Sequence, residues 1–385
     1  MRQTYLDHAA TTPMDPLVLQ EMMPYFKEKF GNSSSIHAYG QDAKNALDVA
    51  RARAAKLIGA TADEIYFTSG GTEANNMAVL GTANLKENKR CHVITTAIEH
   101  PAVLNTVKYL ETMGFEATFL PVDPEGIIRL EDLEKAIRPN TKLISIMHAN
   151  NEIGTIQPVE QIGKLAKERK IAFHTDAIQT ASKMPLDVDK LGVDFLSISA
   201  HKIYGPKGVG MLYMRKGTKI QQLMFGGSHE KGLRPSTSNV PGIAGFGKAA
   251  ELAVQRLDFD VPRITRMRER IIDGTLGNIK DSFLTGHRTK RLPNLASFRF
   301  RFIEGEGMLL HLDIAGIAAS TGSACSSKSL KASHVLLALG LPQEEVHGSL
   351  RISLGRENTD EDVEYFLKEM PPIVEKLRKM SPLAR

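Results

Sequence analysis

From about residue 60 to residue 215 the chain alternates short apolar runs, rich in β-branched residues, with longer amphipathic stretches. This alternation is typical of strands joined by crossover helices, and it predicts a mostly parallel sheet covered on both faces. We expect helices between strands at 65–68, 92–96, 117–122, 142–148, 171–175, 195–199 and 210–213. One helix should begin at Pro158 and place Val159, Ile162 and Leu165 on one face. In such sheets ligands bind beyond the carboxyl ends of the strands, so polar residues there are the site candidates.

The last third of the chain has a different pattern. A long helix is expected at about 258–280, followed by strands near 295–302, 317–320 and 349–353. A final helix should begin near Thr359 and be interrupted by Pro371 and Pro372, because proline lacks the N–H that a helix interior uses. This pattern predicts a smaller α+β domain after the α/β domain.

Composition excludes several classes of protein. Two cysteines in 385 residues exclude a disulfide framework and an all-cysteine metal site, and no His-Glu-x-x-His pattern supports another metal centre. The net charge of +5 is spread along the chain and does not require nucleic acid. No run approaches the roughly 20 apolar residues of a membrane span, and residues 1–8 lack a signal core. We therefore expect a cytoplasmic protein that binds neither nucleic acid nor membrane.

A glycine-rich turn, Thr-Ser-Gly-Gly-Thr-Glu-Ala-Asn-Asn, occupies residues 68–76 between a predicted strand and a predicted helix. Glycines let the backbone approach an anion, and a helix start offers unpaired N–H groups. Gly71 and Thr72 thus form a candidate phosphate cradle. The alternative is an ordinary turn with Thr72 as helix cap, and a nucleotide P-loop is excluded because its Gly-Lys-Ser/Thr ending is missing.

Two more predicted strands end in residues suited to chemistry. Lys202 follows the run 195–199, where an amine can be desolvated enough to act as a nucleophile. Asp176 follows the run 171–175, where its carboxylate could face a ligand cation. The alternatives are a solvated lysine at a strand exit and a helix cap.

The two cysteines have different surroundings. Cys91 heads an apolar strand and is expected to be a buried core residue. Cys325 lies among small polar residues in Ser-Thr-Gly-Ser-Ala-Cys-Ser-Ser-Lys, which favours exposure and reactivity. His100, Asn151 and Arg351 gain interest only in combination with the residues above.

Taken together, these segments resemble the cysteine desulfurases of the NifS/IscS type, within the aminotransferase-like pyridoxal phosphate enzymes of fold type I. The motifs that carry the resemblance occur in order at 5–7, 9–12, 31–32, 69–73, 99–100, 151–154, 176–179, 199–202 and 322–325. The resemblance implies an N-terminal segment (1–15) that packs with the small domain, a large cofactor-binding domain (16–257) and a small domain with the catalytic cysteine loop (258–385).

The resemblance also implies pyridoxal 5'-phosphate as the cofactor. Lys202 would bind it covalently and then move a proton as base and acid, while Asp176 would pair with its ring nitrogen. His100 would stack on the ring and exchange a proton with the substrate thiol. The other implied cofactor contacts are Gly71, Thr72, Asn151, Gln179, Ser199, His201 and Thr237, the last from the partner subunit of a homodimer.

The implied reaction converts L-cysteine to L-alanine. Arg351 and Asn151 would bind the substrate, and Cys325 would take its sulfur as a persulfide for an iron–sulfur scaffold protein or another acceptor. Relatives of the IscS type carry a tail longer than the one ending at Arg385, which leaves the acceptor open. The alternatives are another pyridoxal phosphate enzyme, such as a selenocysteine lyase or an aminotransferase, and a sulfur carrier without catalysis of its own.

Overall fold

The computed structural model describes residues 2–88, 90–321 and 332–382. A seven-stranded sheet lies at its centre, in the order β2-β8-β7-β6-β5-β3-β4. Its strands are β2 (Ile65–Thr68), β3 (His92–Thr96), β4 (Glu116–Leu120), β5 (Thr141–Ser145), β6 (Ala172–Asp176), β7 (Phe195–Ser199) and β8 (Gly210–Met214). Only β8 runs against its neighbours, so the prediction of a mostly parallel sheet is confirmed.

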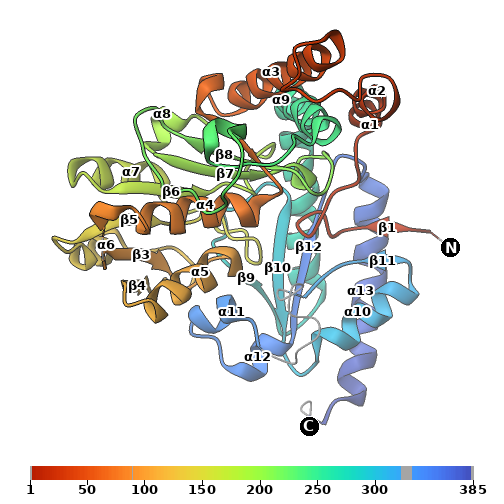
Figure 1. Cartoon of the computed structure of the whole chain (residues 1–385). Helices are drawn as coiled ribbons and strands as arrows, with labels where there is room; N and C mark the ends of the chain where they lie inside the picture. Colours follow the sequence, from red (N-terminus) through yellow and green to blue (C-terminus); the bar gives the residue numbers. More distant parts are fainter. Residues whose placement is uncertain (1, 89, 322–331, 383–385) are drawn as a thin grey trace.

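Helices cover both faces of this sheet, as predicted (Figure 1). The helices before and within this part of the chain are α1 (Pro16–Met22), α2 (Pro24–Lys27), α3 (Ala38–Leu57), α4 (Gly71–Ala83), α5 (Pro101–Thr112), α6 (Leu130–Ala136), α7 (Val159–Glu168) and α8 (Val188–Leu191). Short 3-10 helices are η1 (Ala62–Glu64), η2 (Lys86–Asn88), η3 (Ala200–Lys202) and η4 (His229–Gly232). The predicted helix at Pro158 is α7, which buries Val159 and Ile162 while Leu165 is partly buried.

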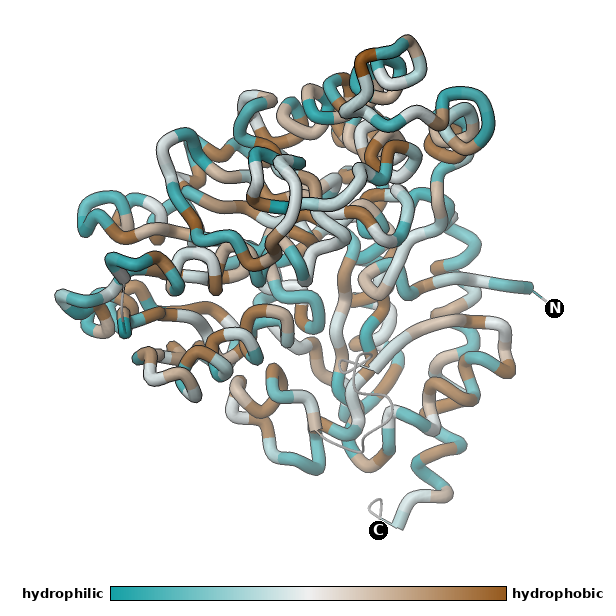
Figure 2. The backbone as a smooth tube through the Cα atoms, viewed as in Figure 1, coloured by the Kyte–Doolittle hydropathy of each residue, from teal (hydrophilic) through white to brown (hydrophobic). Residues whose placement is uncertain are grey.

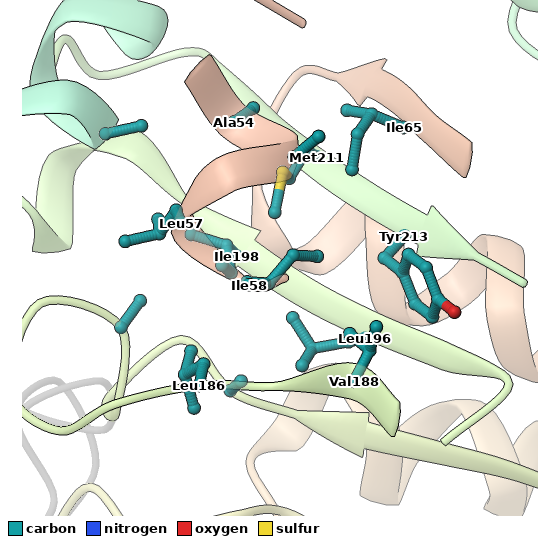
Figure 3. Packing of buried hydrophobic residues seen from close by; sticks show 14 of the residues in the cluster. Ala54, Leu57, Ile58, Ile65, Leu186, Val188, Leu196, Ile198, Met211 and Tyr213 are labelled. Atoms are coloured by element: carbon teal, nitrogen blue, oxygen red, sulfur yellow. The ribbon is translucent and has the colours of Figure 1, made fainter. Parts of the chain in front are cut away.

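Alternating side chains of each strand reach opposite faces of the sheet. In β8, Met211 and Tyr213 pack with α3 and α9 (Val240–Asn278), whereas Leu212 packs with α4. Figure 3 shows the first of these packings, where Ile58 at the end of α3 lies among strand residues. In Figure 2 the hydrophobic segments follow the central strands, and hydrophilic residues concentrate on the outer helices and loops. Strands apolar on both faces therefore explain the continuous apolar runs in the sequence.

The C-terminal part forms a second, smaller hydrophobic core. An antiparallel sheet in the order β12-β10-β9 packs against α10 and α13. The elements are β9 (Ser282–Thr285), β10 (Leu295–Phe300), α10 (Gly305–Ile314), β11 (Ile317–Ala318), α11 (His334–Ala338), α12 (Gln343–His347), β12 (Ser349–Ser353) and α13 (Asp360–Met380). The short strand β1 (Thr4–Tyr5) pairs in parallel with β11. The domain boundaries given above remain a prediction.

Two helices differ from the prediction. The expected helix at 258–280 is the second half of α9, which begins at Val240. Buried residues of α9 up to Ala253 pack in the large core, and those from Ile264 onward pack in the small core. The expected break at Pro371 and Pro372 was wrong, because α13 continues to Met380.

The reason for this continuity is packing. Before and after the two prolines, Phe366, Met370 and Val374 are buried in the small core. Because proline has no N–H, the backbone carbonyls of Leu367 and Lys368 lack the donors that a regular helix would supply. Lys368 is exposed, so water can reach its carbonyl. Burial of the apolar stripe therefore outweighs the local preference for a break.

Candidate active site

A cavity of about 670 Å³ lies at the carboxyl ends of the parallel strands and is closed on one side by the small domain. Of the predicted site residues that the structure describes, all except Thr237 line it. They are Gly71, Thr72, His100, Asn151, Asp176, Gln179, Ser199, His201, Lys202 and Arg351. Thr237 is exposed and does not line the cavity of its own chain. Cys325 falls outside the described residues.

Separate elements deliver these side chains to the cavity. Asp176 is the last residue of β6, and Lys202 ends the short helix η3 that follows β7. His100 caps α5 just after β3, and Gly71 begins α4 after β2. Arg351 comes from the middle of β12 in the small domain. The convergence follows from the sheet, since neighbouring parallel strands end at the same edge.

The amine of Lys202 lies against the N-terminal segment. Its Nζ donates hydrogen bonds to the carbonyl oxygens of Ala9 and Ala10, the latter at 2.7 Å. Gln179 donates from Nε2 to the same Ala9 carbonyl at 3.0 Å. Residues 9 and 10 thus form one wall of the site and hold the lysine at the cavity surface.

The carboxylate of Asp176 is fixed by two donors. Oδ2 accepts a hydrogen bond from Asn75 Nδ2 at 2.7 Å, and Oδ1 accepts one from the Ile178 N–H at 3.0 Å. Asn75 is fully buried in α4, so the helix that follows the glycine-rich turn also orients the acid. The sequence analysis assigned no role to Asn75, although it lies within the quoted turn.

His100 is held as a neutral ring. Its Nδ1 accepts a hydrogen bond from the Ala102 N–H at 3.1 Å, which leaves the proton of the neutral ring on Nε2. Burial lowers the pKa of His100, opposed by the charge of Asp176 and assisted by that of Lys202. A neutral imidazole with a defined tautomer can accept or donate one proton at the cavity wall.

Arg351 is buried, and its guanidinium is anchored at both terminal nitrogens. Nη1 donates to the carbonyl of Asn151 at 2.9 Å, and Nη2 forms an ion pair with Asp7 Oδ1 at 2.8 Å. Its Nε is buried without a hydrogen-bond partner among the described residues. Each terminal nitrogen carries two N–H groups and uses one of them in these contacts, so the guanidinium keeps a second N–H on each for a carboxylate in the cavity that it lines.

Two buried glutamates, which the sequence analysis did not assign to the site, lie beside the cavity. Ser333 donates from Oγ to Glu152 Oε2 at 2.5 Å, and burial raises the pKa of Glu152 to about 7. Glu99 accepts from Thr96 Oγ1 and from the Met147 N–H, and burial raises its pKa to about 8. His334 contacts the Glu99 carbonyl at 2.9 Å. Contacts between distant segments, here 99 and 334, leave no periodic signal in a sequence.

Other expectations concern residues away from these contacts. Cys91 is buried, as predicted, and burial raises its pKa to about 11. Across the ranges that the structure describes, no group of histidine, cysteine and acidic side chains is arranged to hold a metal ion. Within the same ranges no helix combines the length and apolar character needed to cross a bilayer.

Comparison with known proteins identifies the family. The pattern of class-V aminotransferases matches residues 4–366. A protein from Dictyoglomus turgidum named cysteine desulfurase IscS is 55% identical over 99% of this chain and 97% of its own length. The chain belongs to the cysteine desulfurase family. A desulfurase of the same name from Methanosarcina thermophila is 52% identical over 99% of this chain and 94% of its own length.

Solved structures agree with this membership of the cysteine desulfurase family. A structure described as a NifS-like protein superposes with a TM-score of 0.92 at 41% identity, covering 98% of this chain and all of the other. A NifS-like protein from Rickettsia africae gives a TM-score of 0.87 at 32% identity over 97% of this chain and all of the other. The predicted fold class and family are therefore confirmed.

Enzymes of the cysteine desulfurase family depend on pyridoxal phosphate, and the cavity fits that cofactor. A buried carboxylate, Asp176, suits a protonated ring nitrogen, and an amine, Lys202, suits a covalent link. Gln179 Oε1 is buried without a hydrogen-bond partner in the described part of the chain. The start of α4 at Gly71 borders the cavity and offers N–H groups to a phosphate.

Proposed function

We propose that this cavity removes sulfur from L-cysteine, releases L-alanine and leaves the sulfur on Cys325 as a persulfide. The observation that carries the proposal is the convergence of Lys202, Asp176 and Arg351 on one cavity. These three groups match the aldehyde, the ring nitrogen and the amino-acid carboxylate that the reaction brings together.

Pyridoxal phosphate, when bound, supplies an electron sink for the carbon bonds of an amino acid. In our proposal Lys202 holds it covalently and, once released, moves the Cα proton as base and then acid. Asp176 would pair with the ring nitrogen, and Asn75 orients its carboxylate through a hydrogen bond of 2.7 Å. Gly71, Thr72, Ser199 and His201 would hold the phosphate.

Substrate recognition is assigned to groups at the opposite wall. Arg351 binds the carboxylate of L-cysteine with donors that Asp7 and the Asn151 carbonyl leave free. His100 lines the cavity and would accept the proton of the substrate thiol, because its lowered pKa keeps the ring neutral at pH 7.

The sulfur step balances without an external oxidant. The Cys325 thiolate attacks the substrate sulfur, an S–S bond forms and the C–S bond breaks. The electron pair of the C–S bond stays with the carbon fragment, which takes up a proton and leaves as alanine. Cys325 then carries the sulfur to an acceptor, which we propose is an iron–sulfur scaffold protein or another sulfur-accepting protein.

We also propose a homodimer in the cytoplasm. Thr237 is exposed and does not line the cavity of its own chain, so it is free to contact the cofactor of a partner subunit. Large apolar side chains are exposed along the segment from α1 to α3, including Leu17, Phe26, Phe30 and Ile36. Isolated apolar residues are common on surfaces, but a run of large ones is typical of an interface. Sparse cysteine use suits a reducing compartment.

The test is product analysis with the purified holoenzyme. L-cysteine plus a thiol reductant should give alanine and sulfide in equal amounts, and without reductant the sulfur should appear as a protein persulfide. A 2-oxo acid as product in place of alanine, or alanine from selenocysteine but not from cysteine, would support one of the alternatives instead.

A further inference from the structure

The segment 228–237 leads to Thr237 through a backbone conformation that residues other than glycine rarely adopt. Glu230 and Lys231 have φ angles of +47° and +55°, in the left-handed region, and Gly232 continues the turn at +82°. In this region the Cβ atom of an L-residue crowds a carbonyl oxygen, so such a turn persists only where other contacts hold it. The contacts that hold this turn have no role in the chemistry proposed above.

Glu230 fastens the turn to the edge of the large sheet. Strand β2 is the outermost strand on its side of the sheet, so the backbone groups on its outer edge need partners other than a strand. Glu230 Oε2 accepts a hydrogen bond from the Phe67 N–H at 3.0 Å. Arg51 pairs with both oxygens of Glu230, at 2.8 and 2.7 Å, and also donates to the Ile65 carbonyl. The Arg51–Glu230 pair thus satisfies backbone groups that a further strand would otherwise bind.

The Arg51–Glu230 pair is largely shielded from water. The side-chain exposures are 8% for Glu230 and 20% for Arg51, and the Arg51 guanidinium lies 4.7 Å from the centre of the Phe67 ring. A two-pronged pair between arginine and a carboxylate fixes direction as well as distance. Because Glu230 is itself one of the left-handed residues, this pair fixes the course that the chain takes toward Thr237.

A second anchor lies three residues before Thr237. Arg234 donates from Nε to Glu73 Oε1 at 2.9 Å, and Glu73 Oε2 accepts a hydrogen bond from the Ser69 N–H at 2.6 Å. Ser69 and Glu73 belong to the glycine-rich turn of the same chain. The segment is therefore tied to the sheet edge and to the turn before α4, while Thr237 itself is exposed.

We infer that the Arg51–Glu230 pair positions Thr237 for the cofactor site of the partner subunit, by fixing the turn from which this segment departs. The inference rests on the proposed homodimer and on the proposed contact of Thr237 with the partner's cofactor. Arg51 and Glu230 line no part of the cavity of their own chain, so they act as positioning residues. Their loss should loosen the cofactor of the other subunit. The cofactor of their own subunit should stay bound, because Arg234 still holds the glycine-rich turn.

The test uses mixed dimers of two differently tagged chains. The first chain carries Lys202→Ala and links no cofactor, so the linked cofactor belongs to the second chain and receives Thr237 from the first. Glu230→Gln is placed either on the first chain, in trans, or on the second chain, in cis. The dimers are diluted into an excess of an unrelated apoenzyme that binds pyridoxal phosphate. Samples are then reduced with borohydride, and mass spectrometry measures the cofactor that remains on Lys202.

Glu230→Gln in trans should speed the loss of cofactor about ten-fold, which corresponds to one weakened charge-assisted hydrogen bond. In cis it should leave the rate of the parent mixed dimer unchanged. Thr237→Ala in trans gives the full effect of the contact. Glu345→Gln in trans is the matched control and should have no effect. Glu345 is also a largely buried glutamate, 16% exposed, and it pairs with Arg299 at 2.9 Å and Arg301 at 2.7 Å in the small domain.

Equal rates in cis and in trans would overturn the inference, because a general structural defect acts in both arrangements. An unchanged rate in trans would overturn it too. If Glu230→Gln does not fold, Arg51→Lys replaces it, since lysine keeps the charge but cannot pair with both oxygens of Glu230. Failure of both variants to fold would also overturn the inference, because the pair would then be a requirement of the fold itself.

Failure of the proposed function would look different. Cofactor linked to another lysine would contradict the proposed role of Lys202, and chains that form no mixed dimer would contradict the proposed homodimer. Thr237→Ala without effect in trans would contradict the proposed contact of Thr237. If Thr237→Ala in trans speeds the loss of cofactor and Glu230→Gln does not, the inference about the Arg51–Glu230 pair alone is wrong.

Discussion

Arg351 Nη2 lies 2.8 Å from Asp7 Oδ1, although 344 residues separate the two along the chain. The pair is largely buried, with side-chain exposures of 3% for the arginine and 17% for the aspartate. Asp7 belongs to the N-terminal segment, and Arg351 belongs to the strand β12 of the small domain. The contact therefore fixes the guanidinium before any substrate arrives, so ordering its long side chain adds little to the cost of binding.

Arg351→Lys should weaken the binding of L-cysteine. A lysine cannot contact Asp7, the Asn151 carbonyl and a substrate carboxylate with one planar group. We expect KM to rise about 10- to 100-fold, corresponding to a lost charge-assisted hydrogen bond of about 1.5–3 kcal/mol. Cofactor content, measured by absorbance, should stay normal.

Arg53→Lys is the matched control for this prediction. Arg53 lies on α3, away from the cavity, and is paired with Glu21 at 2.9 Å. The Arg53→Lys variant should therefore show the wild-type KM. An unchanged KM in Arg351→Lys would mean that another group binds the carboxylate.

Lys202→Ala should abolish the covalent attachment of the cofactor. The amine that Ala9 and Ala10 hold at the cavity wall would be gone, and with it the proposed proton transfer. Turnover should fall by at least about 100-fold. Mass spectrometry after borohydride reduction should find no cofactor-modified peptide, and a modified peptide at another lysine would refute the assignment.

Asp176→Asn should keep the fold but impair the chemistry. The amide of the variant can still form a hydrogen bond with Asn75 if one of the two amide groups rotates by half a turn. It cannot stabilise a protonated ring nitrogen as a carboxylate does. We expect a shifted cofactor absorption band and turnover lower by about 100-fold or more. Near-normal turnover with an unshifted band would show that a different acid serves the ring.

Cys325→Ser should still bind the cofactor but should form no protein persulfide and almost no alanine. Cys91→Ser is the control, since Cys91 is buried and burial raises its pKa to about 11, far from a reactive thiolate at neutral pH. Persulfide detected on Cys91, or full alanine production without Cys325, would contradict the proposed mechanism.

Glu99→Gln should change how stability depends on pH. Burial raises the pKa of Glu99 from 4.5 to about 8, so the folded protein holds a proton that the unfolded chain releases between these values. Glu99 therefore makes the free energy of unfolding fall as pH rises through this window. The Tm of the variant relative to the wild type should increase from pH 5 to pH 8, as calorimetry can measure. A constant difference would mean that Glu99 is ionised throughout.

Much of the fold could be predicted because buried parallel strands leave continuous apolar runs. The expected strands at 65–68, 92–96, 195–199 and 349–353 coincide with β2, β3, β7 and β12. Strand β9 (Ser282–Thr285) was missed because it is short and only its last residue is buried. The continuity of α13 was missed because packing on the small core outweighs two prolines, and packing is not visible locally.

Several residues that line the cavity could be predicted from the sequence, but their contacts could not. Strand-exit positions and the resemblance pointed to Lys202, Asp176 and His100, which all line the cavity. The partners that orient them lie far away in the chain, as Asn75 does from Asp176 at a separation of 101 residues. Only the folded chain brings such pairs together, since the local sequence around one residue does not indicate its distant partner.

The pairing of β1 with β11 has a consequence for synthesis on the ribosome. Thr4 is aligned with Ile317, and Leu6 is fully buried in the core of the C-terminal part. Residues 4–6 are therefore translated long before the C-terminal segments with which they pack. During this interval the large sheet can form while the N-terminal strand and Leu6 remain unprotected. We expect nascent chains that stall before residue 317 to be recognised by chaperones or proteases through this end, even when the large sheet is already folded.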